Sequence, residues 1–210
     1  MKVLVTGSSG HLGEAVMRVL PAFGHEPVGL DITPGPFTTH VGSITDCAVV
    51  RRAMGGAAMV LHTATLHKPH VATHSRRDFV ETNISGTLML LEEALSSGVS
   101  GFVFTSTTSV FGAALSPAAG EPAAWIDETV SPIPKNIYGT TKTAAEDLCT
   151  LFASRHGLKC IILRTSRFFP EADDSSEIRD ADDDTNAKAN EFLHRRVDIE
   201  DVASAHERAM

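Results

Sequence analysis

Aromatic residues, cysteines and long apolar runs are scarce in this chain, and each shortage excludes a class of protein. The 210 residues include one tryptophan, one tyrosine and three cysteines. Cys47, Cys149 and Cys160 have neither a CxxC nor a metal-ligand spacing, which is typical of a protein in a reducing cytosol. No run approaches the ~20 apolar residues of a membrane span, and Gly7 comes too early for a signal peptide. We therefore expect a cytoplasmic protein that does not contact a membrane.

Basic side chains are also in the minority. The chain has 18 lysines and arginines against 26 aspartates and glutamates, which gives a formal net charge of −8. A nucleic-acid partner held by bulk electrostatics is therefore not expected. The length is ample for a sizeable core and favours one large domain, or one domain and part of a second.

Short apolar runs alternate with helical patterns along most of the chain. The runs that predict strands cover residues 2–6, 28–30, 57–62, 101–105 and 159–163. The patterns that predict helices cover residues 11–20, 75–97 and 138–156, the first of them closed by Pro21 and Gly24. Buried strands that alternate with helices favour a parallel sheet. The predicted fold class is α/β, a Rossmann-type doubly wound parallel sheet.

A glycine-rich turn follows the first predicted strand and opens the first predicted helix. Its sequence, Gly7-Ser-Ser-Gly10-His-Leu-Gly13, allows a tight turn, close backbone approach to a pyrophosphate and close helix–strand packing. The N–H groups at the helix start then meet the phosphate charge. A glycine-rich turn without a ligand is the alternative reading of these residues alone.

Asp31 ends the second predicted strand, 18 residues beyond Gly13. A carboxylate at this point accepts hydrogen bonds from an adenosine ribose and repels a 2′-phosphate. The next residues, Ile32, Thr33 and Pro34, offer no arginine, so NAD is favoured over NADP. The alternative is that Asp31 is an ordinary turn residue at the end of a strand.

The single tyrosine, Tyr138, precedes Lys142 by four residues, so that both side chains lie on one helical face. A free phenol has a pKa of about 10, and each unit of lowering needs about 1.4 kcal/mol of differential interaction. A nearby ammonium and a cationic nicotinamide ring both favour the phenolate, so the pair can exchange a proton with an alcohol or ketone. Pro134 upstream and the hydroxyls of Ser106 and Thr107 distinguish this pair from an accidental surface pair.

These motifs occur in the same order as in the extended short-chain dehydrogenases/reductases. The sequence resembles the NAD-dependent epimerase/dehydratase branch of that superfamily. Six segments carry the resemblance: Val5 to Gly13, Gly42 to Asp46, His62 to Thr65, Glu81 to Leu88, Phe104 to Gly112 and Pro134 to Lys142. Ser43, Thr65 and Thr141 depart from the family pattern within them.

The resemblance implies hydride transfer. Tyr138 is then the acid/base, Lys142 lowers its pKa and binds the nicotinamide ribose, and Thr107 hydrogen-bonds the substrate oxygen, with Ser106 beside it. The residues implied in cofactor binding are Gly7, Ser9, Gly10, His11, Leu12, Gly13, Asp31, Asp46, His62, Ala64, Asn83 and Lys142. Asp46 is expected to approach the adenine amine, and Asn83 to help order the active site.

The substrate is less closely defined, because Arg167 stands where nucleotide-sugar members of the family carry an asparagine. Pro170 likewise stands at a glycine of that pattern. An arginine can grip a phosphate or carboxylate as a fork, or it can be structural. The expected substrate is a sugar or nucleotide sugar, converted by an epimerase, dehydratase or dehydrogenase. A carbonyl reductase of a small non-sugar compound and a non-catalytic NAD-binding regulator are the alternatives.

The resemblance also gives a domain plan. We expect an NAD-binding domain over residues 1–165 and a small, incomplete C-terminal substrate lobe over residues 166–210. In this lobe, an ordered unit over residues 195–199 leads into a short helix over residues 200–210. The sequence then stops where family members continue, which is compatible with a fragment, with one part of a longer protein and with a trimmed member.

An acidic segment lies inside that lobe. Residues 173–184 contain seven acidic side chains against one arginine and have no apolar periodicity, which indicates a solvated loop. Four acidic positions also match those of a calcium loop, but Thr185 stands at its obligatory glycine. The matching residues are Asp180, Asp182, Asp184 and Glu191.

Two further features concern metals and assembly. His62, His67, His70 and His74 cluster without a cysteine or carboxylate at ligand spacing, so we expect polar loop residues and no metal site. The helices predicted over residues 75–97 and 138–156 carry apolar stripes. In the resembled family, the corresponding helices pair across a two-fold axis, which implies a homodimer.

Overall fold

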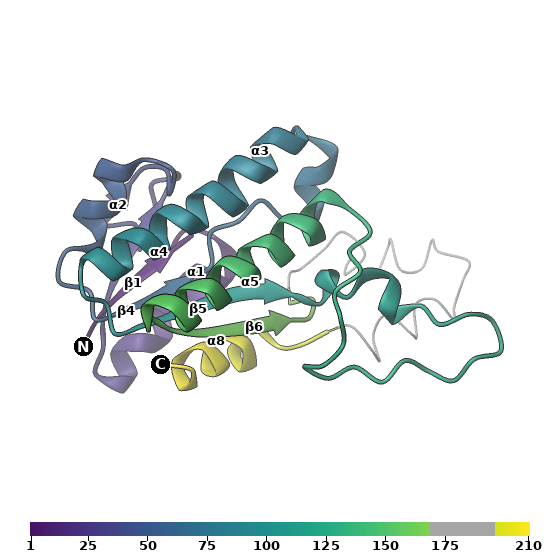
Figure 1. Ribbon diagram of the computed structural model, residues 1–210. Helices are drawn as coiled ribbons and strands as arrows, with labels where there is room; N and C mark the ends of the chain where they lie inside the picture. Colours follow the sequence, from purple (N-terminus) through teal and green to yellow (C-terminus); the bar gives the residue numbers. More distant parts are fainter. Residues whose placement is uncertain (169–195) are drawn as a thin grey trace, which may run out of the picture.

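The computed structural model of the protein describes residues 1–168 and 196–210. Within them, six parallel strands form one sheet in the order β3-β2-β1-β4-β5-β6 (Figure 1). The strands are β1 (Lys2–Thr6), β2 (Glu26–Asp31), β3 (His40–Val41), β4 (Met59–His62), β5 (Gly101–Thr107) and β6 (Lys159–Thr165). The strand order reverses between β1 and β4, and such a switch point opens a crevice at the carboxyl ends of the strands. The predicted Rossmann-type sheet is confirmed.

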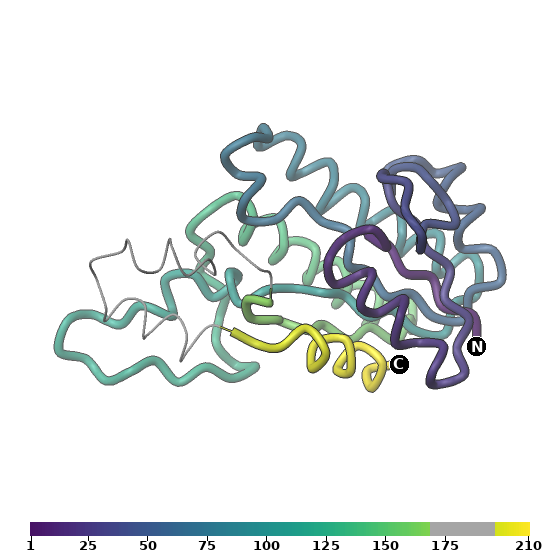
Figure 2. Tube along the Cα trace, turned by 180° about the vertical axis from the view of Figure 1, so that it is seen from behind, coloured from purple at the N-terminus to yellow at the C-terminus, as the bar shows by residue number. Residues whose placement is uncertain are grey.

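Helices cover both faces of this sheet (Figures 1 and 2). The helices are α1 (His11–Val19), α2 (Cys47–Met54), α3 (Arg76–Val80), α4 (Gly86–Ser96), α5 (Ile137–His156) and α8 (Ile199–Arg208). Shorter turns are η1 (Leu20–Phe23), η2 (Lys68–Ala72), the π-helical η3 (Glu81–Ser85), η4 (Thr108–Val110) and η5 (Gly112–Leu115). One face packs against α2, α4 and α5, and the other against α1 and α8. Among the described helices, none is long and apolar enough to span a membrane.

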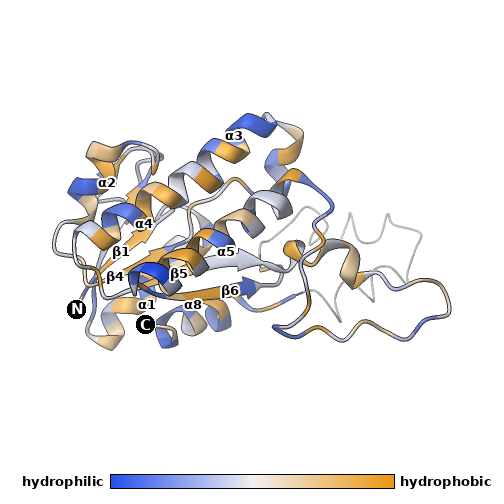
Figure 3. Ribbon diagram, viewed as in Figure 1, coloured by the Kyte–Doolittle hydropathy of each residue, from blue (hydrophilic) through white to orange (hydrophobic). Residues whose placement is uncertain are grey.

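β1 shows how one strand serves both helical layers. Leu4 packs in the core on the side of α2, α4 and α5, whereas Val3 and Val5 pack on the side of α1 and α8. The three side chains are fully buried, because successive residues of a strand point to opposite faces. Figure 3 shows hydrophobic colour along the strands and a mixture of both colours along the helices. The sheet is therefore a rigid base for the loops at its carboxyl edge.

The sequence patterns miss two elements and merge three others. β3 has two residues, and α2 has eight, so neither is long enough to give a clear periodic signal. The helix predicted over residues 75–97 is divided into α3, η3 and α4. Its interruption by a π-helical turn coincides with the buried Asn83. Such turns often occur at functional sites.

The described part of the C-terminal segment returns to the sheet. The backbone N–H of Val197 donates to the carbonyl oxygen of Arg167 at 2.9 Å, and Arg167 and Arg196 form a parallel bridge. The short helix expected over residues 200–210 is present as α8, which packs on α1. Pro170, Arg195, the predicted acidic loop and its calcium-loop positions lie outside the described residues.

Candidate active site

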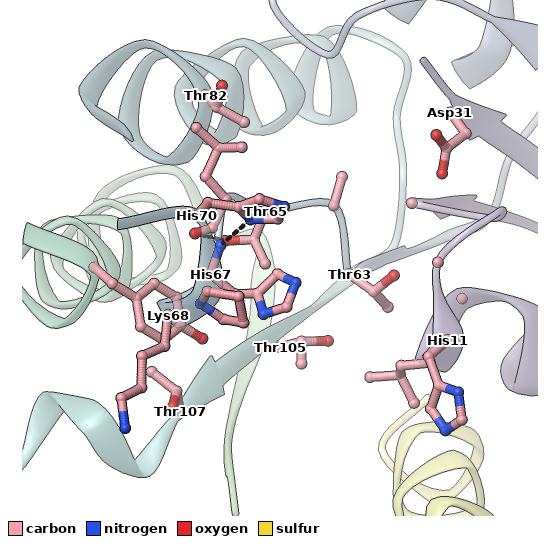
Figure 4. A pocket seen from close by; sticks show the side chains of 18 of the residues that line it. His11, Asp31, Thr63, Thr65, His67, Lys68, His70, Thr82, Thr105 and Thr107 are labelled. Carbon is pink, nitrogen blue, oxygen red and sulfur yellow. Dashed lines mark hydrogen bonds between the residues drawn. The ribbon is translucent and has the colours of Figure 1, made fainter. Parts of the chain in front are cut away.

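A cavity of about 740 Å³ lies at the carboxyl edge of the sheet. Its lining comes from the segments that follow β1, β2, β4, β5 and β6, together with residues of the N-terminal part of α5. Figure 4 shows side chains from these segments converging on one space, with Asp31 and His11 on one side and Thr107 on the other. One end of the cavity therefore presents a carboxylate and an imidazole, and the other end presents a hydroxyl.

The glycine turn forms one wall, and two of its glycines have no room for a side chain. Gly7 has a φ of +76°, and a Cβ there would lie 2.8 Å from the amide nitrogen of Ala64. A Cβ on Gly13 would lie 1.9 Å from the carbonyl oxygen of Gly7. Gly10 caps α1 without a side-chain hydrogen bond, and His11, Leu12 and Gly13 line the cavity. The N-terminus of α1 thus offers backbone N–H groups to a diphosphate.

Asp31 is held at the cavity edge by two backbone groups. Its Oδ2 accepts from the N–H of Ser9 at 2.9 Å, and its Oδ1 accepts from the N–H of Thr33 at 2.8 Å. The carboxylate is oriented by these bonds and retains lone pairs for a ligand hydroxyl. A glycine turn without room for a Cβ at Gly7 and Gly13, followed by a fixed carboxylate, is the donor and acceptor set that a dinucleotide requires. The residues present therefore fit NAD.

At the other end, α5 brings Tyr138 to Thr107. The helix starts there because the side chain of Asn136 caps it by accepting from the N–H of Gly139 at 2.9 Å. Tyr138 is almost buried, and burial raises the pKa of its phenol to about 12. A hydrogen bond with the Thr107 side chain acts in the opposite direction and lowers this pKa. Both residues line the cavity, as the sequence predicts.

Lys142 is placed differently from the expectation. Its Nζ donates to the carbonyl oxygen of Thr105 at 2.5 Å and lies 3.9 Å from the centre of the Phe104 ring. The side chain is buried against β5 and is not part of the cavity lining. Burial lowers the pKa of this ammonium to about 7, because its charged form loses its water. The contact with the nicotinamide ribose that the resemblance implies stays a prediction.

Sequence reasoning missed a buried polar network beside Lys142. Ser106 donates its hydroxyl proton to Glu146, one turn beyond Lys142 on α5, and Arg164 of β6 forks onto the same carboxylate with a shortest distance of 2.8 Å. The guanidinium also lies 4.9 Å from the centre of the Phe111 ring. The sequence did contain one signal for this network. Tyr138, Lys142 and Glu146 are spaced four residues apart, which places Glu146 on the same helical face as the other two.

Three residues expected to bind the cofactor serve the protein's own structure. His62 is buried between the hydroxyls of Thr6 at 2.7 Å and Thr87 at 2.9 Å. Asp46 caps α2 by accepting from two backbone N–H groups. Neither residue, nor Asn83, belongs to the cavity lining. Their expected contacts with NAD therefore remain predictions that these side-chain positions do not favour.

Asn83 holds the loop after β4 with both ends of its amide. Its Oδ1 accepts from the N–H of Leu66 at 2.8 Å and from the hydroxyl of Thr65 at 3.0 Å. Its Nδ2 donates to the carbonyl oxygen of Leu66 at 2.9 Å and to the hydroxyl of Thr141 at 3.1 Å. Asn83 thereby ties the cavity wall to α5.

Several other predicted residues also line the cavity. Ser9, Ala64, Ser106 and Arg167 contribute to the wall, and the ring of His11 stacks with Phe168 at 6.4 Å between centroids. His67, His70 and His74 also line the cavity, from the turn after β4. In the described part of the chain, no three metal-ligating side chains come together in a way that would hold an ion.

Comparison with known proteins gives a consistent result. The model of the NAD dependent epimerase/dehydratase family matches residues 3–187. A UDP-glucose 4-epimerase of Erwinia amylovora is 30% identical over 182 residues, which cover 78% of this chain and 52% of that protein. An NAD-dependent glucose-6-phosphate dehydrogenase of Haloferax volcanii is 29% identical over 180 residues, which cover 77% of this chain and 66% of that protein.

A solved structure extends the similarity to the whole described fold. The complex of UDP-glucose 4-epimerase from Thermus thermophilus with NAD superposes with a TM-score of 0.77 and 27% identity. The match covers 100% of this chain and 74% of that chain. The match covers 39–52% of the length of three of the curated relatives and 66% of the Haloferax protein.

Proposed function

Because the chain belongs to the NAD-dependent epimerase/dehydratase family, we propose that it transfers a hydride between NAD and a hydroxyl or ketone of a sugar or nucleotide sugar. One observation carries this proposal. The Tyr138 phenol and the Thr107 hydroxyl meet at one end of a cavity whose other end is a glycine cradle with a fixed Asp31 carboxylate. A proton-transfer pair beside a dinucleotide cradle is the arrangement that hydride transfer needs.

NAD is the cofactor of the family, and the chain supplies a place for each part of it. The turn from Gly7 to Gly13 and the first N–H groups of α1 would hold the diphosphate. Asp31 would accept hydrogen bonds from the adenosine ribose and exclude a 2′-phosphate. When bound, NAD supplies a hydride acceptor at its nicotinamide ring.

The protein residues then manage the proton. With its pKa raised to about 12, the Tyr138 phenol is protonated at neutral pH and donates to a ketone oxygen as that ketone is reduced. In the opposite direction Tyr138 must become a phenolate, which positive charge nearby favours. The hydroxyl of Thr107 would donate its single proton either to the substrate oxygen or to the Tyr138 phenolate. Its hydrogen bond with Tyr138 lowers the pKa of the phenol. Lys142, one turn further along α5, would supply the positive charge in its protonated form, and its pKa of about 7 makes that form dependent on pH near neutrality.

Arg167 favours an anionic sugar as the substrate of this function. The arginine contributes to the cavity wall at the end of β6, where a guanidinium can bind a phosphate or carboxylate of the substrate. The Haloferax relative named a glucose-6-phosphate dehydrogenase is consistent with such a substrate. Epimerisation, in which the hydride returns to the same molecule, is distinguished from net oxidation by whether NADH accumulates.

The proposal is tested by turnover across substrate classes. We expect wild-type protein with NAD to convert at least one compound among nucleotide sugars, sugar phosphates, free sugars and sugar acids. NADH absorbance reports net oxidation, and chromatography of the sugar products reports epimerisation or dehydration. The variant Tyr138→Phe keeps the ring and loses the proton, so it should lose turnover by about 100-fold or more while still binding NAD. Unchanged turnover in this variant contradicts the mechanism, and NAD binding without turnover of any compound favours a regulator.

We further propose that the protein acts in the cytoplasm as a homodimer. α4 and α5 lie side by side on one face of the sheet (Figure 1). Leu95 of α4 and Leu151 of α5 are 40% and 47% exposed, so both helices present an apolar side chain that a partner could cover. Equivalent helices of two copies would cover both.

A further inference from the structure

The turn η2 is held by His67 and His70. Nδ1 of the His70 ring accepts from the backbone N–H of His67 at 3.0 Å, and the backbone N–H of His70 donates to the carbonyl oxygen of His67 at 2.9 Å. The two rings meet edge to face with 4.4 Å between centroids. The His70 ring thus takes the place that a carboxylate usually takes in a capping box.

This arrangement fixes the protonation of His70. A nitrogen that accepts a hydrogen bond from a backbone N–H cannot carry a proton itself, so the His70 ring is neutral with its proton on Nε2. The direction of the pKa agrees, since burial lowers the pKa of His70 and also lowers that of His67 to about 4. The His70 ring is therefore an N–H donor whose orientation is set before any ligand arrives.

The turn lies at the Tyr138 end of the cavity. Ala64, just after β4, adjoins the glycine turn, and the chain from there leads away from the cradle to η2, which packs against α5. Figure 4 shows His67 and His70 projecting from one turn into the cavity, with Thr105 and Thr107 on the facing side. The rings consequently face the space beside the reactive phenol and hydroxyl, away from the phosphate cradle.

We propose that His70 is a substrate-recognition residue, whose neutral imidazole donates its Nε2–H to a hydroxyl or carbonyl oxygen of a sugar ring. The inference rests on the proposed function and names the part of the substrate that this wall binds. A neutral donor suits an uncharged oxygen, because it brings no charge to compensate a phosphate or a carboxylate. His70 thus selects compounds by the positions of their hydroxyl groups.

The protonation pattern is tested by NMR of protein labelled with nitrogen-15 in its histidines, with NAD present. At neutral pH, we expect His70 to carry its proton on Nε2 alone. UDP-glucose, glucose 6-phosphate or galactose should shift this signal, whereas UDP or inorganic phosphate alone should not. A proton on Nδ1, or equal shifts with inorganic phosphate, overturns the inference in favour of an anion site. The absence of a shift with every sugar also overturns it.

Two matched variants test the role in binding. His70→Gln and His70→Glu both keep a side-chain oxygen that can accept from the His67 N–H, but only glutamine keeps a donor. For the substrate that the wild type converts, we expect about a tenfold rise in KM with His70→Glu, and a rise below about threefold with His70→Gln. In both variants kcat and NAD affinity should stay within about twofold of the wild type.

The control is His156→Gln, at the exposed C-terminal end of α5, which should change neither constant. An unchanged KM in His70→Glu, with wild-type turnover present, overturns the recognition site and leaves the proposed function standing. Equal rises in KM in the two variants also overturn it. A wild type that converts no compound contradicts the proposed function, and the inference falls with it.

Discussion

The carboxylate of Glu146 lies between the hydroxyl of Ser106 and the guanidinium of Arg164, in the layer between α5 and the sheet. Ser106 is adjacent to Thr107, so the network fixes the end of β5 that presents the reactive hydroxyl. A buried carboxylate is costly unless its oxygens are paired, and here two elements supply the partners. The position of Thr107 therefore depends on a residue that contacts no ligand.

This dependence predicts the effect of Glu146→Gln, which preserves shape and removes the charge. We expect the free energy of unfolding to fall by about 1–3 kcal/mol, because the partly exposed Arg164 guanidinium loses its counter-ion and the buried Ser106 hydroxyl loses a charged acceptor. Turnover should also fall, since the Ser106 hydroxyl loses its strongest acceptor. Urea denaturation and steady-state kinetics measure the two effects.

The exposed ion pair of Glu14 and Arg18 provides the matched control. Glu14→Gln removes the same charge at the surface of α1, where solvent screens the pair, and should cost less than about 1 kcal/mol. Equal losses in the two variants would contradict a special role for the Glu146 network.

Of the residues that the patterns and the family resemblance predicted, several lie on the cavity and others lie away from it. Tyr138, Thr107 and Asp31 lie on the cavity as predicted, because they follow strand ends or open a helix, and those positions can be recognised locally. His62 was expected beside the cofactor. Its partners, Thr6 and Thr87, lie 56 and 25 residues away in the sequence, so no local pattern could show that its ring is buried between them.

At the scale of elements, the π-helical turn η3 connects the wall of the cavity to its reactive helix. It turns Asn83 inward, so that one amide binds the loop after β4 and the hydroxyl of Thr141 on α5. An uninterrupted helix over residues 75–97, as the periodicity predicts, would place the residues on either side of the turn in a different rotational register. A single extra residue in a helical turn has no composition signal, which explains why the sequence does not predict it.

Asn83→Asp tests this connection. An aspartate accepts but does not donate, so the carbonyl oxygen of Leu66 loses its partner and faces a carboxylate. We expect faster hydrogen exchange over residues 63–70 and a loss of about 1–3 kcal/mol in the free energy of unfolding.

The rate of exchange in β1 serves as the internal reference for Asn83→Asp. If exchange rises equally in β1 and in the loop after β4, the effect is global and the proposed local connection is wrong. Mass spectrometry of peptides from both regions distinguishes these results.

The whole molecule is a sheet buried on both faces, and this explains why its architecture was predictable. Continuous apolar runs that alternate with helical patterns are typical of a doubly wound parallel sheet, because its strands are covered by helices on both faces. The same arrangement predicts that the outer faces of α4 and α5 are polar, because an amphipathic helix that covers a sheet needs no outward apolar residue. Leu95 and Leu151 depart from that rule.

The proposed homodimer is tested through Leu151→Glu. A charge in an apolar interface between copies would be buried without a partner, so we expect this variant to be monomeric at concentrations where the wild type is dimeric. Analytical ultracentrifugation measures both masses. Ile32→Glu provides the comparison, since Ile32 is 72% exposed after β2 and lies on neither helix. A monomeric wild type would contradict the dimer.

The packing of α8 against α1 has a consequence for synthesis. Leu12 and Val16 of α1 share a core cluster with Val202 and Ala203 of α8. On the ribosome, α1 is complete about 180 residues before α8 begins, an interval of roughly 10–40 s at ~5–20 residues per second. For that time the apolar side of α1 lacks the contacts that α8 supplies, so this part of the core can form only after α8 has been made.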